Sequence, residues 1–429
     1  MERSKQYVPH QSVRYLNPEN KDDSGKPLPM LYENRENCCG CTACEAACPV
    51  NAIVMADDSE GFPYPVIDAK QCLRCGKCLA VCRLKEDQRE KGYLKDAPPK
   101  TTEAASKEPP ACYAVKHKNF EIRMASRSGG IFTAVSDWIL EQGGVVYGCV
   151  QTKDFLAQHI RAERKEDRDR MRGSKYIQSS LDGIFPQVRS DLDAGRKVLF
   201  SGTSCQVAGL KSYLRTDYEN LLTVDIVCHG VPSPLIWKEY LVWQSKKHKA
   251  VCKAVDFRNK RDFGWKAHVE TLTLQNVRGE MIQVNSEVYK RMFNGVYLSR
   301  PSCYQCPYKS VFHPADLTIA DYWGIQKIAP EFNDNKGVSL VLVNTDGGKA
   351  LFEQVKDTVE LLECRLEDSL QPALKAPFPV PADRTEFWKM FYSEPFEALA
   401  KKYGGYGFVN TAKRKLGRLK RSLKAKLRR

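Results

Sequence analysis

The 429-residue sequence contains no apolar run long enough to cross a bilayer. A membrane-spanning helix needs about 18 or more consecutive apolar residues, so we expect no integral membrane segment. The chain also begins with the polar residues Met1–Gln6 and shows no apolar secretory region. Since it has 17 cysteines and no export signal, we expect a reducing, cytoplasmic compartment, in which metal-binding thiolates are protected.

Acidic residues are absent from residues 411–429, which carry ten Lys or Arg, so only +5 of the net charge of +15 belongs to the rest of the chain. The body of the protein therefore gives no reason to expect nucleic-acid binding. The spacing of four leucines predicts one face of a short basic helix: Leu416, Leu419, Leu423 and Leu427. Such a helix could lie peripherally on the inner face of an anionic membrane or on an acidic partner. A solvated terminus explains the same pattern.

Eight cysteines near the amino terminus form two runs with the same spacing, C-x2-C-x2-C-x3-C. The runs are Cys38, Cys41, Cys44 and Cys48, followed by Cys72, Cys75, Cys78 and Cys82. This spacing is typical of bacterial-type ferredoxins with two [4Fe–4S] clusters, in which the fourth cysteine of a run binds the other cluster. We therefore assign Cys38, Cys41, Cys44 and Cys82 to the first cluster. The second cluster takes Cys72, Cys75, Cys78 and Cys48.

Zinc and disulfides are the alternatives for these cysteines. Zinc sites usually combine two C-x2-4-C pairs across a loop, whereas here four cysteines lie within eleven residues. A disulfide framework suits a small secreted domain, which this chain is not. Cys39 lies off register within the first run, so we interpret it as a spare thiol. Iron–sulfur clusters are the preferred interpretation.

Composition divides the chain into five segments. They are a polar segment at 1–34, the two-cluster module at 35–86, a linker at 87–110, a large domain with its own core at 111–380, and an extension with the basic tail at 381–429. The linker is charged and rich in Pro, Ala and Thr, so we expect a flexible tether without rigid geometry. Within the module, residues 52–55 and 62–66 predict short strands around a turn at 59–61.

The large region alternates apolar runs with helical patterns. We predict helices at 131–140, 206–214 and after Pro232-Ser233-Pro234, and strands at 145–150, 198–200 and 221–227. The strand at 198–200 is expected to break at 201–203. Further strands are expected at 317–320 and 338–343, with a hairpin of 268–274 and 281–284. The fold class is therefore mixed α/β (α+β), with a mainly parallel sheet in the first part and antiparallel character further on.

Two loops are candidates for holding a cofactor. The first is the start of the predicted helix at 131–140, where Ser128, Gly129, Gly130 and Thr133 offer a close backbone approach, free amides and hydroxyls. A flavin or dinucleotide pyrophosphate would suit it, and an ordinary helix-start turn is the alternative. The second loop carries Lys175, which could neutralise a phosphate, and Tyr176, which could stack on a flavin ring. A polar surface loop is its alternative.

Four more cysteines could bind a third [4Fe–4S] cluster. They are Cys205 and Cys228, each just past a predicted strand, and the close pair Cys303 and Cys306. Since ligands gather at the carboxyl ends of parallel strands, these loops could meet at one sheet edge. A redox-active dithiol is the alternative for the close pair, and buried apolar cysteine is the alternative for each one alone. We interpret Cys112, Cys149, Cys252 and Cys364 as structural.

Six motifs in order resemble the beta subunits of coenzyme F420-reducing hydrogenases and related dehydrogenases. The motifs are Ser128-Gly129-Gly130, Gly173-Ser174-Lys175-Tyr176, residues 202–210, residues 227–233, Cys303-Tyr304-Gln305-Cys306 and residues 320–324. The resemblance implies an FAD that exchanges a hydride with deazaflavin F420 or a related two-electron substrate, and single electrons with iron–sulfur clusters. The family also includes chloroplast reductases of chlorophyll derivatives that use no deazaflavin. Ser204 stands where the Gly-Thr-Pro-Cys version of the motif at residues 202–205 has proline. This difference affects the stiffness of the loop more than its ligand.

These observations predict an iron–sulfur flavoprotein oxidoreductase. Its partners would be an electron-carrier protein or a partner oxidoreductase subunit, and a small-molecule hydride donor or acceptor. No general acid or base is evident; His229 is the best placed, and a core histidine is the simpler interpretation. A non-catalytic electron-transfer adaptor without flavin is the main alternative, and a zinc-dependent nucleic-acid binder is a third hypothesis.

Overall fold

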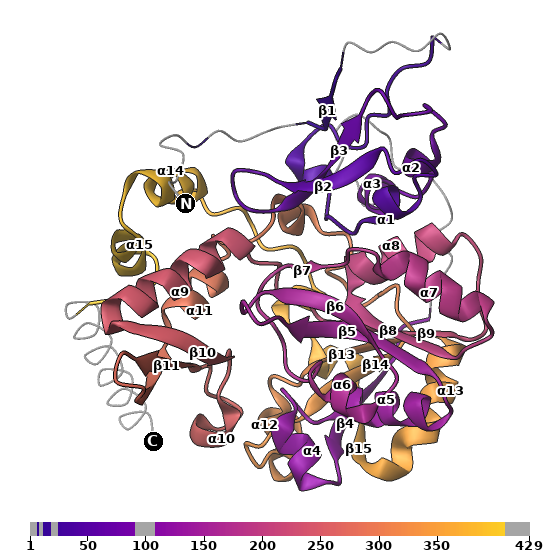
Figure 1. Ribbon diagram of the computed structural model, residues 1–429. Coiled ribbons are helices and arrows are strands. Elements are labelled where there is room, and N and C mark those ends of the chain that lie inside the picture. The colour runs from indigo at the N-terminus through magenta and orange to yellow at the C-terminus, as the bar shows by residue number, and fades with distance from the viewer. Residues whose placement is uncertain (1–6, 8–11, 19–24, 91–107, 408–429) are drawn as a thin grey trace.

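The structure, a computed structural model, describes residues 7, 12–18, 25–90 and 108–407 (Figure 1). Most of the predicted tether and all of the predicted basic helix at 411–429 lie outside the described residues. Among the helices that are described, none has the length and apolar character needed to cross a membrane.

A nine-stranded sheet forms the centre of the large region. Its strands, in spatial order, are β15 (Val359–Cys364), β4 (Ala111–His117), β14 (Ser339–Val343), β13 (Leu317–Asp321), β9 (Leu221–Ile226), β8 (Val198–Thr203), β5 (Val145–Gln151), β6 (Ala157–Ala162) and β7 (Ser179–Ser180). The central strands β13, β9, β8 and β5 are parallel, whereas β14, β4 and β15 on one side and β6 on the other join antiparallel. The mixed fold is confirmed, with parallel strands at the centre of the sheet and antiparallel strands on both sides.

Helices cover both faces of this sheet (Figure 1). One face packs against α5 (Ile131–Glu141) and α13 (Asp346–Val355) through a fully apolar core. The other packs against α7 (Ile184–Asp193) and α8 (Ser204–Leu214). Three short helices, α4 (Phe120–Ala125), α6 (Lys165–Asp169) and α12 (Ile325–Ile328), lie in the connections.

Most of the predicted elements are confirmed within one to three residues at each end. The break expected at 201–203 is wrong, because β8 continues to Thr203, which pairs with Ile226 of β9. Thr203 then caps α8 directly, and the Gln206 side chain accepts the Thr203 backbone N–H at 2.9 Å. The strand therefore passes into the helix without a loop, and this places Cys205 in the first turn of α8.

A second, three-stranded sheet lies beside the first. It is formed by β10 (Ala250–Asp256), β11 (Glu270–Asn276) and β12 (Met281–Ser286), so the predicted hairpin is confirmed. Around it pack α9 (Pro234–His248), α11 (Val288–Asn294), α14 (Arg384–Ser393) and α15 (Phe396–Lys402), while α10 (Lys260–Phe263) lies in the connection between β10 and β11. Their shared core is rich in buried aromatic side chains, including Trp237, Tyr240 and Trp388.

The cysteine-rich module forms a third sheet with short helices. Its elements are β1 (Arg14–Leu16), β2 (Ile53–Asp57), β3 (Pro63–Asp68), α1 (Ala43–Ala46), α2 (Lys77–Ala80) and α3 (Arg83–Glu90). The predicted strand pair is confirmed as antiparallel β2 and β3. Strand β1 comes from the polar segment 1–34 and pairs in parallel with β3. The proposed segment boundaries themselves stay a prediction.

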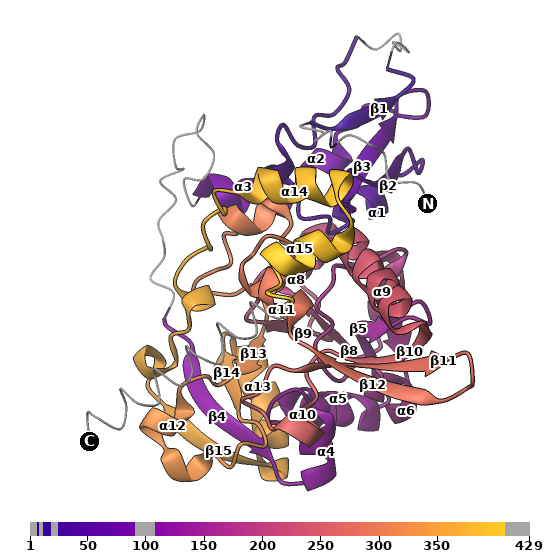
Figure 2. The same cartoon turned by 90° about the vertical axis from the view of Figure 1, so that its left-hand side faces the viewer.

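The module is held against the large region by contacts of its own (Figure 2). Ala43 and Val81 of the module belong to the same apolar core as α7 and α8. Glu60, which is fully buried, pairs with Arg384 of α14 as well as with Arg35 of the module. The position of the module therefore does not depend on the geometry of the tether.

Candidate functional site

The structure brings cysteines of the two runs of the module close together. Burial, followed by the charges of Cys41 and Cys38, raises the pKa of the Cys82 thiol to about 12. In the other set, burial and the charges of Cys72, Cys48 and Cys75 raise the pKa of the Cys78 thiol to about 11. Cys82 therefore lies near Cys41 and Cys38, and Cys48 lies near Cys78, which agrees with the crossed assignment; the assignment itself stays a prediction.

Hydrogen-bond donors surround the sulfur atoms. The backbone N–H of Ala52 donates to Cys48 Sγ at 3.2 Å, and that of Arg74 donates to Cys72 Sγ at 3.4 Å. Within the described residues, no group of three or more His, Cys, Asp or Glu side chains is placed to hold a single metal ion. A [4Fe–4S] cluster needs a different arrangement of ligands, because each of its four thiolates binds a separate iron atom. Two sets of four thiols with N–H donors fit two [4Fe–4S] clusters.

The four loop cysteines of the large region also meet. Cys205 stands in the first turn of α8, Cys228 follows β9, and the 3-10 turn Pro301–Gln305 carries Cys303 next to Cys306. Burial, followed by the charge of Cys303, raises the pKa of Cys228 to about 12, and Cys205 adds to this effect. Burial and the charges of these three thiols likewise raise the pKa of Cys306. The set is therefore compact enough for a third cluster, which stays a proposal.

Cys39 lies between the two sets of thiols. Its side chain is hydrogen-bonded to both Cys41, of the first cluster set, and Cys205, of the loop set. The hydrogen bond from Cys39 lowers the pKa of the Cys205 thiol below its ordinary value. The residue interpreted from the sequence as a spare thiol therefore bridges the module and the large region.

The close approach of α8 to the module depends on Gly209. A Cβ atom at this position would lie 2.8 Å from both Cβ and Sγ of Cys41, closer than the 3.5–4.0 Å of favourable carbon contacts. Alanine is normally better than glycine in a helix interior by about 1 kcal/mol. We expect the steric overlap to outweigh this gain.

A Gly209→Ala variant should therefore lose the first cluster, about four irons per chain, because Cys41 must move. Iron and sulfide analysis of the anaerobically purified variant measures the loss. Gly347→Ala is the matched control, since a Cβ there meets its nearest atom at an ordinary 3.7 Å. Equal iron in the two variants would show that Cys41 can shift without losing the cluster.

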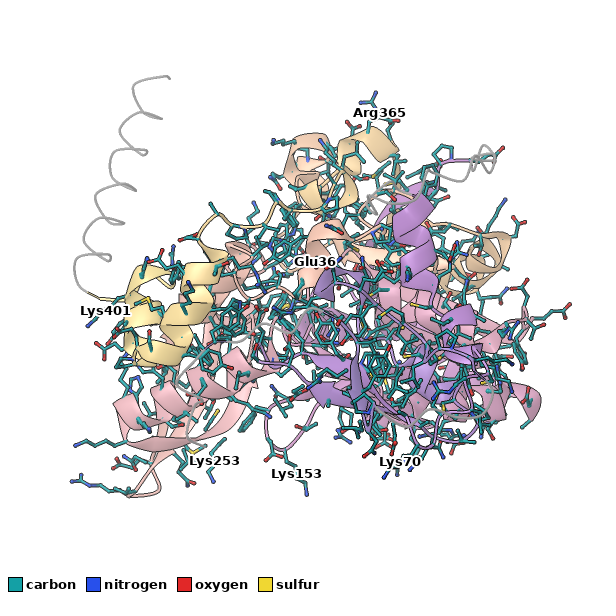
Figure 3. The ribbon with its side chains drawn as sticks, turned by 90° about the horizontal axis from the view of Figure 1, so that it is seen from above. Glu36, Lys70, Lys153, Lys253, Arg365 and Lys401 are labelled. Carbon is teal, nitrogen blue, oxygen red and sulfur yellow. The ribbon has the colours of Figure 1, made fainter. Side chains whose placement is uncertain are left out.

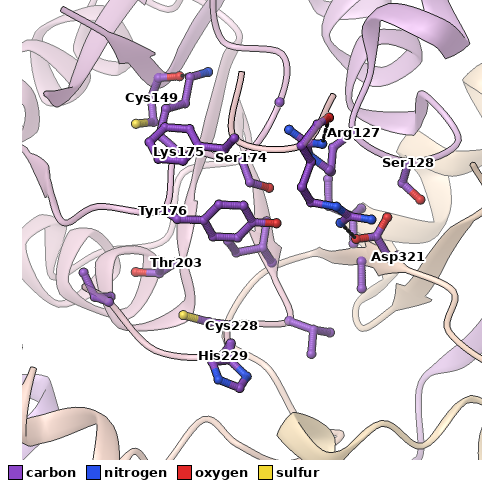
Figure 4. A pocket seen from close by; sticks show the side chains of 18 of the residues that line it. Arg127, Ser128, Cys149, Ser174, Lys175, Tyr176, Thr203, Cys228, His229 and Asp321 are labelled. Carbon is purple, nitrogen blue, oxygen red and sulfur yellow. Dashed lines mark hydrogen bonds and ion pairs between the residues drawn. The ribbon is translucent and has the colours of Figure 1, made fainter. Parts of the chain in front are cut away.

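A cavity of about 510 Å³ lies at the carboxyl ends of the central strands. Figure 4 shows the cavity wall. Tyr176 lies between Arg127 on one side and Cys228 and His229 on the other. The thiol-bearing side of the wall includes Cys39, Cys205 and Cys228. The cavity volume is within the range usual for small-molecule and cofactor sites.

The predicted Ser-Gly-Gly loop has two roles. Gly130, with φ +98°, starts α5 and lines the cavity. Gly129 instead packs against the sheet, where a Cβ would lie 2.1 Å from the Val115 carbonyl oxygen. The hydroxyl of Ser128 donates to the Val338 carbonyl at 2.6 Å. Thr133 accepts a hydrogen bond from Arg172 Nε at 3.1 Å. Most of these groups build the cavity wall rather than face its interior.

Lys175 and Tyr176 both line the cavity. The Lys175 ammonium lies 2.9–3.0 Å from four backbone carbonyls, those of Cys149, Arg170, Met171 and Arg172. Burial lowers its pKa to about 8. Lys175 therefore orders its own loop, which differs from the expected phosphate contact. The Tyr176 ring packs against Phe257 and Phe293, with centroids 5.7 and 5.2 Å apart.

Two arginines and an aspartate of the wall were not singled out from the sequence. Arg258 pairs with Asp321 at 2.5 Å, and Arg127 donates to the Arg258 carbonyl at 2.6 Å. Within the described residues, Nε of Arg127 and Nε of Arg258 are buried and have no hydrogen-bond partner. Unsatisfied buried N–H groups are costly, so they point to an anionic ligand. Asp321 lies in the motif at residues 320–324 and Arg127 directly precedes the Ser128-Gly129-Gly130 motif, whereas Arg258 gave no sequence signal.

His229 lines the cavity between two aromatic rings, with centroids 4.8 Å from Phe293 and 4.4 Å from Phe378. Burial, followed by the charge of Lys309, lowers its pKa to about 4. The ring is therefore neutral near pH 7. Of the cysteines interpreted as structural, Cys112 and Cys364 are opposite each other on β4 and β15, and Cys149 lines the cavity. Cys252 lies in β10.

Two curated proteins are similar to this chain over long segments. The coenzyme F420-dependent sulfite reductase of Methanocaldococcus jannaschii is 27% identical over 197 residues, which are 41% of this chain and 30% of that protein. The chain therefore spans less than a third of that relative. One of the subunits of the F(420)H(2) dehydrogenase of Methanosarcina mazei is 21% identical over 340 residues, which are 76% of this chain and 84% of that protein.

One solved structure is also similar. It is a xenon derivative of the F420-reducing [NiFe] hydrogenase complex from Methanosarcina barkeri, with 18% identity over 68% of this chain and 90% of that chain. The TM-score of 0.41 is too low for this likeness to support an argument.

Two segments match family models. Residues 37–85 match the 4Fe-4S dicluster domain, which agrees with the two sets of module cysteines. Residues 195–369, which carry all four loop cysteines, match the carboxyl-terminal part of the coenzyme F420 hydrogenase/dehydrogenase beta subunits. The chain is therefore similar to the coenzyme F420 hydrogenase/dehydrogenase beta subunits over residues 195–369, and it carries a 4Fe–4S dicluster domain on the amino-terminal side of that region.

Proposed function

We propose that this chain is an iron–sulfur flavoprotein oxidoreductase that passes electrons between [4Fe–4S] clusters and an FAD, which exchanges a hydride with a two-electron substrate. The observation that carries this proposal is the shared wall of the cavity. On one side it has buried cationic groups at the start of a helix, and on another it has Cys39, Cys205 and Cys228. A ligand in this cavity would lie next to both an anion-binding region and an electron path.

The cavity wall has parts that suit a flavin dinucleotide. The start of α5 offers backbone amides, and Arg127 and Arg172 offer positive charge for phosphates. Tyr176, Phe257 and Phe293 offer an apolar aromatic surface for a ring system. When bound, a flavin supplies the conversion between single electrons and a hydride.

Charged side chains of the chain itself would position and balance the charged groups around the cavity. Asp321 pairs with Arg258 and so keeps this guanidinium at the cavity wall. Lys309 is close to Cys228, Cys303 and Cys306, and their charges act to raise its pKa against the larger effect of burial. A buried cation beside several thiolates offsets their mutual repulsion. Neutral His229 packs between aromatic rings, so it shields this side from water.

The names of the relatives support coenzyme F420 as the candidate two-electron substrate, since two of them are described as acting on it or on its reduced form. These relatives are subunits or longer proteins, which supports a partner oxidoreductase subunit or an electron-carrier protein for this chain. The large domain and the module would then form one electron path, with Cys39 at their junction.

Anaerobic purification followed by iron, sulfide and flavin analysis tests this function. We expect about twelve irons per chain, because three [4Fe–4S] clusters hold four each, and about one flavin released on denaturation. About eight irons would leave the loop cysteines without a cluster. Clusters without flavin would favour the adaptor, and a zinc-loaded, colourless protein would contradict the proposal.

A variant pair separates specific flavin binding from adventitious flavin. Arg127→Gln should lower the flavin content and leave iron unchanged, because Arg127 lies in the cavity wall and apart from the cysteines. Arg365→Gln is the matched control on an exposed turn, where Arg365 pairs with Asp368. Equal flavin in both variants would remove Arg127 from the binding site.

A further inference from the structure

We propose that an acidic one-electron carrier protein docks on the outer face of the module around Cys75. This inference rests on the proposed function and adds the partner to it. The Cys75 face consists of the exposed residues Lys70, Leu73, Cys75, Lys77 and Leu79. It surrounds the second cluster set, and Figure 3 labels Lys70 at the outer edge of the module.

The exposure of Cys75 makes this cluster the accessible one. Among the described residues, Cys75 is the only cysteine that is exposed. The side chains beside it are apolar and also open to solvent, with Leu73 60% and Leu79 44% exposed. Exposed leucines next to a cluster ligand offer the kind of contact that a docking partner can cover.

The first cluster set faces the opposite way. Arg300 donates to Cys38 Sγ at 3.6 Å and to the Cys38 carbonyl at 2.8 Å. Cys41 is covered by Gly209 of α8, and Cys39 connects it to Cys205. The module therefore has an inner cluster toward the cavity and an outer cluster toward solvent. Electrons from a separate protein would reach the outer cluster first.

The charge of the Cys75 face selects an acidic partner. Residues 69–85 contain five Lys or Arg and no Asp or Glu. Lys85 pairs with Glu33, whereas Lys70 and Lys77 form no ion pair with the described residues. The preceding acid, Asp68, accepts a hydrogen bond from the Lys70 backbone N–H at 2.9 Å. Opposite charges steer a carrier toward this face and speed its association.

The small size of the face suits a transient encounter. Electron-transfer partners use interfaces at the low end of the size range, below about 1,200 Å². A few cations around two leucines can serve such a contact, whereas a permanent interface between subunits needs a larger apolar area. The transfer moves one electron: the reduced carrier is oxidised by one electron and the second cluster is reduced by one, with no atom exchanged.

Stopped-flow reduction of the full-length protein by a reduced flavodoxin of net negative charge tests the proposal. A Lys70→Glu/Lys77→Glu variant should react about 10- to 100-fold more slowly at low salt, within the range of electrostatic steering. Added salt should slow the unaltered protein and narrow this difference. The matched control, Lys153→Glu/Lys253→Glu, makes the same charge change on two exposed lysines elsewhere (Figure 3) and should change the rate less than about twofold.

Reduction by the small cationic radical of methyl viologen checks that the clusters remain intact. It should not slow in the Lys70→Glu/Lys77→Glu variant, because the added carboxylates attract this reductant. Equal flavodoxin rates in the two double variants would overturn the docking site, as would faster reaction with a basic carrier. If the Lys70→Glu/Lys77→Glu variant changed the oligomeric state and left the flavodoxin rate unchanged, the face would be a contact between two copies of this chain. That result would also overturn the docking proposal. Failure of the proposed function would instead appear as missing iron or flavin.

Discussion

A Cys228→Ala variant should contain about eight irons per chain where the unaltered protein contains about twelve, because it loses one thiolate of the loop set. The two clusters of the module should remain, since none of their predicted ligands changes. Reduction of these clusters by an external carrier should persist, while electron transfer to a ligand in the cavity should fall. Iron analysis and rapid-mixing absorbance measure the two effects.

Cys112→Ala is the matched control for this prediction. Cys112 is also buried, and burial raises its pKa to about 11, but it lies on β4 away from the loop set. Its replacement should leave the iron content unchanged. If Cys228→Ala and Cys112→Ala retain equal iron, the loop cysteines bind no third cluster. A Cys303→Ala variant gives an independent check in case Cys228→Ala does not fold.

A Glu60→Ala variant should be less stable by about 3–5 kcal/mol, the usual cost of breaking a buried ion pair by removing one partner. Glu60 is fully buried and accepts hydrogen bonds from Arg384 Nη1 at 2.8 Å and Arg35 Nη1 at 2.9 Å. Its loss leaves the Arg384 guanidinium without a carboxylate partner, whereas Arg35 keeps its ion pair with the buried Asp58 at 2.6 Å. Denaturant unfolding measures the change in the free energy of unfolding.

The control for Glu60→Ala is Glu33→Ala, which removes the exposed partner of Lys85. Glu33 is 61% exposed, so this change should cost less than about 1 kcal/mol. Glu60→Gln keeps the shape and removes only the charge, so it separates packing from electrostatics. A Glu60→Ala variant within about 1 kcal/mol of the unaltered protein would contradict the role given to this ion pair.

The same carboxylate predicts a pH dependence. Burial alone would raise the pKa of Glu60, but the charges and hydrogen bonds of Arg384 and Arg35 outweigh it and lower the pKa below its ordinary value of 4.5. The unfolded state therefore binds the proton more readily. The stabilisation should be complete at neutral pH and decline as the pH falls below about 4.5. The stability gap between the unaltered protein and Glu60→Gln should narrow over that range.

Glu60 links stability to function, because it holds the module where Cys41 meets Gly209 and Cys39 reaches Cys205. A module released from Arg384 would keep its own clusters and lose this junction. The docking of the module is thus part of the proposed electron path.

The predictions that the structure or the family models support all came from the spacing of residues within short segments. The two cysteine runs predicted the dicluster domain, since ligands a few residues apart can surround one cluster in a tight loop. The strand and helix patterns around residues 131–150 and 198–227 were correct for a similar reason, because local periodicity records which face is buried. The placement of Cys205 and Cys228 at strand ends followed from this.

Local spacing could not predict the contacts between residues that are far apart in the sequence. Glu60 and Arg384 are 324 positions apart, and Arg258 and Asp321 are 63 apart, so no spacing rule connects them. Cys39 looked surplus because its partner Cys205 belongs to another part of the chain. Lys175 looked available for a phosphate, but the fold supplied four carbonyls around its ammonium.

The sequence by itself determined the presence of a dicluster domain and the five adjacent strands β14, β13, β9, β8 and β5 of the central sheet, because both depend on local spacing. Only the tertiary structure decided how these parts connect. Burial of Glu60 between two arginines and the close approach of α8 at Gly209 place Cys41 against the large region and leave Cys75 exposed on the outside. Such contacts depend on shape and charge across the whole fold, which no local pattern records.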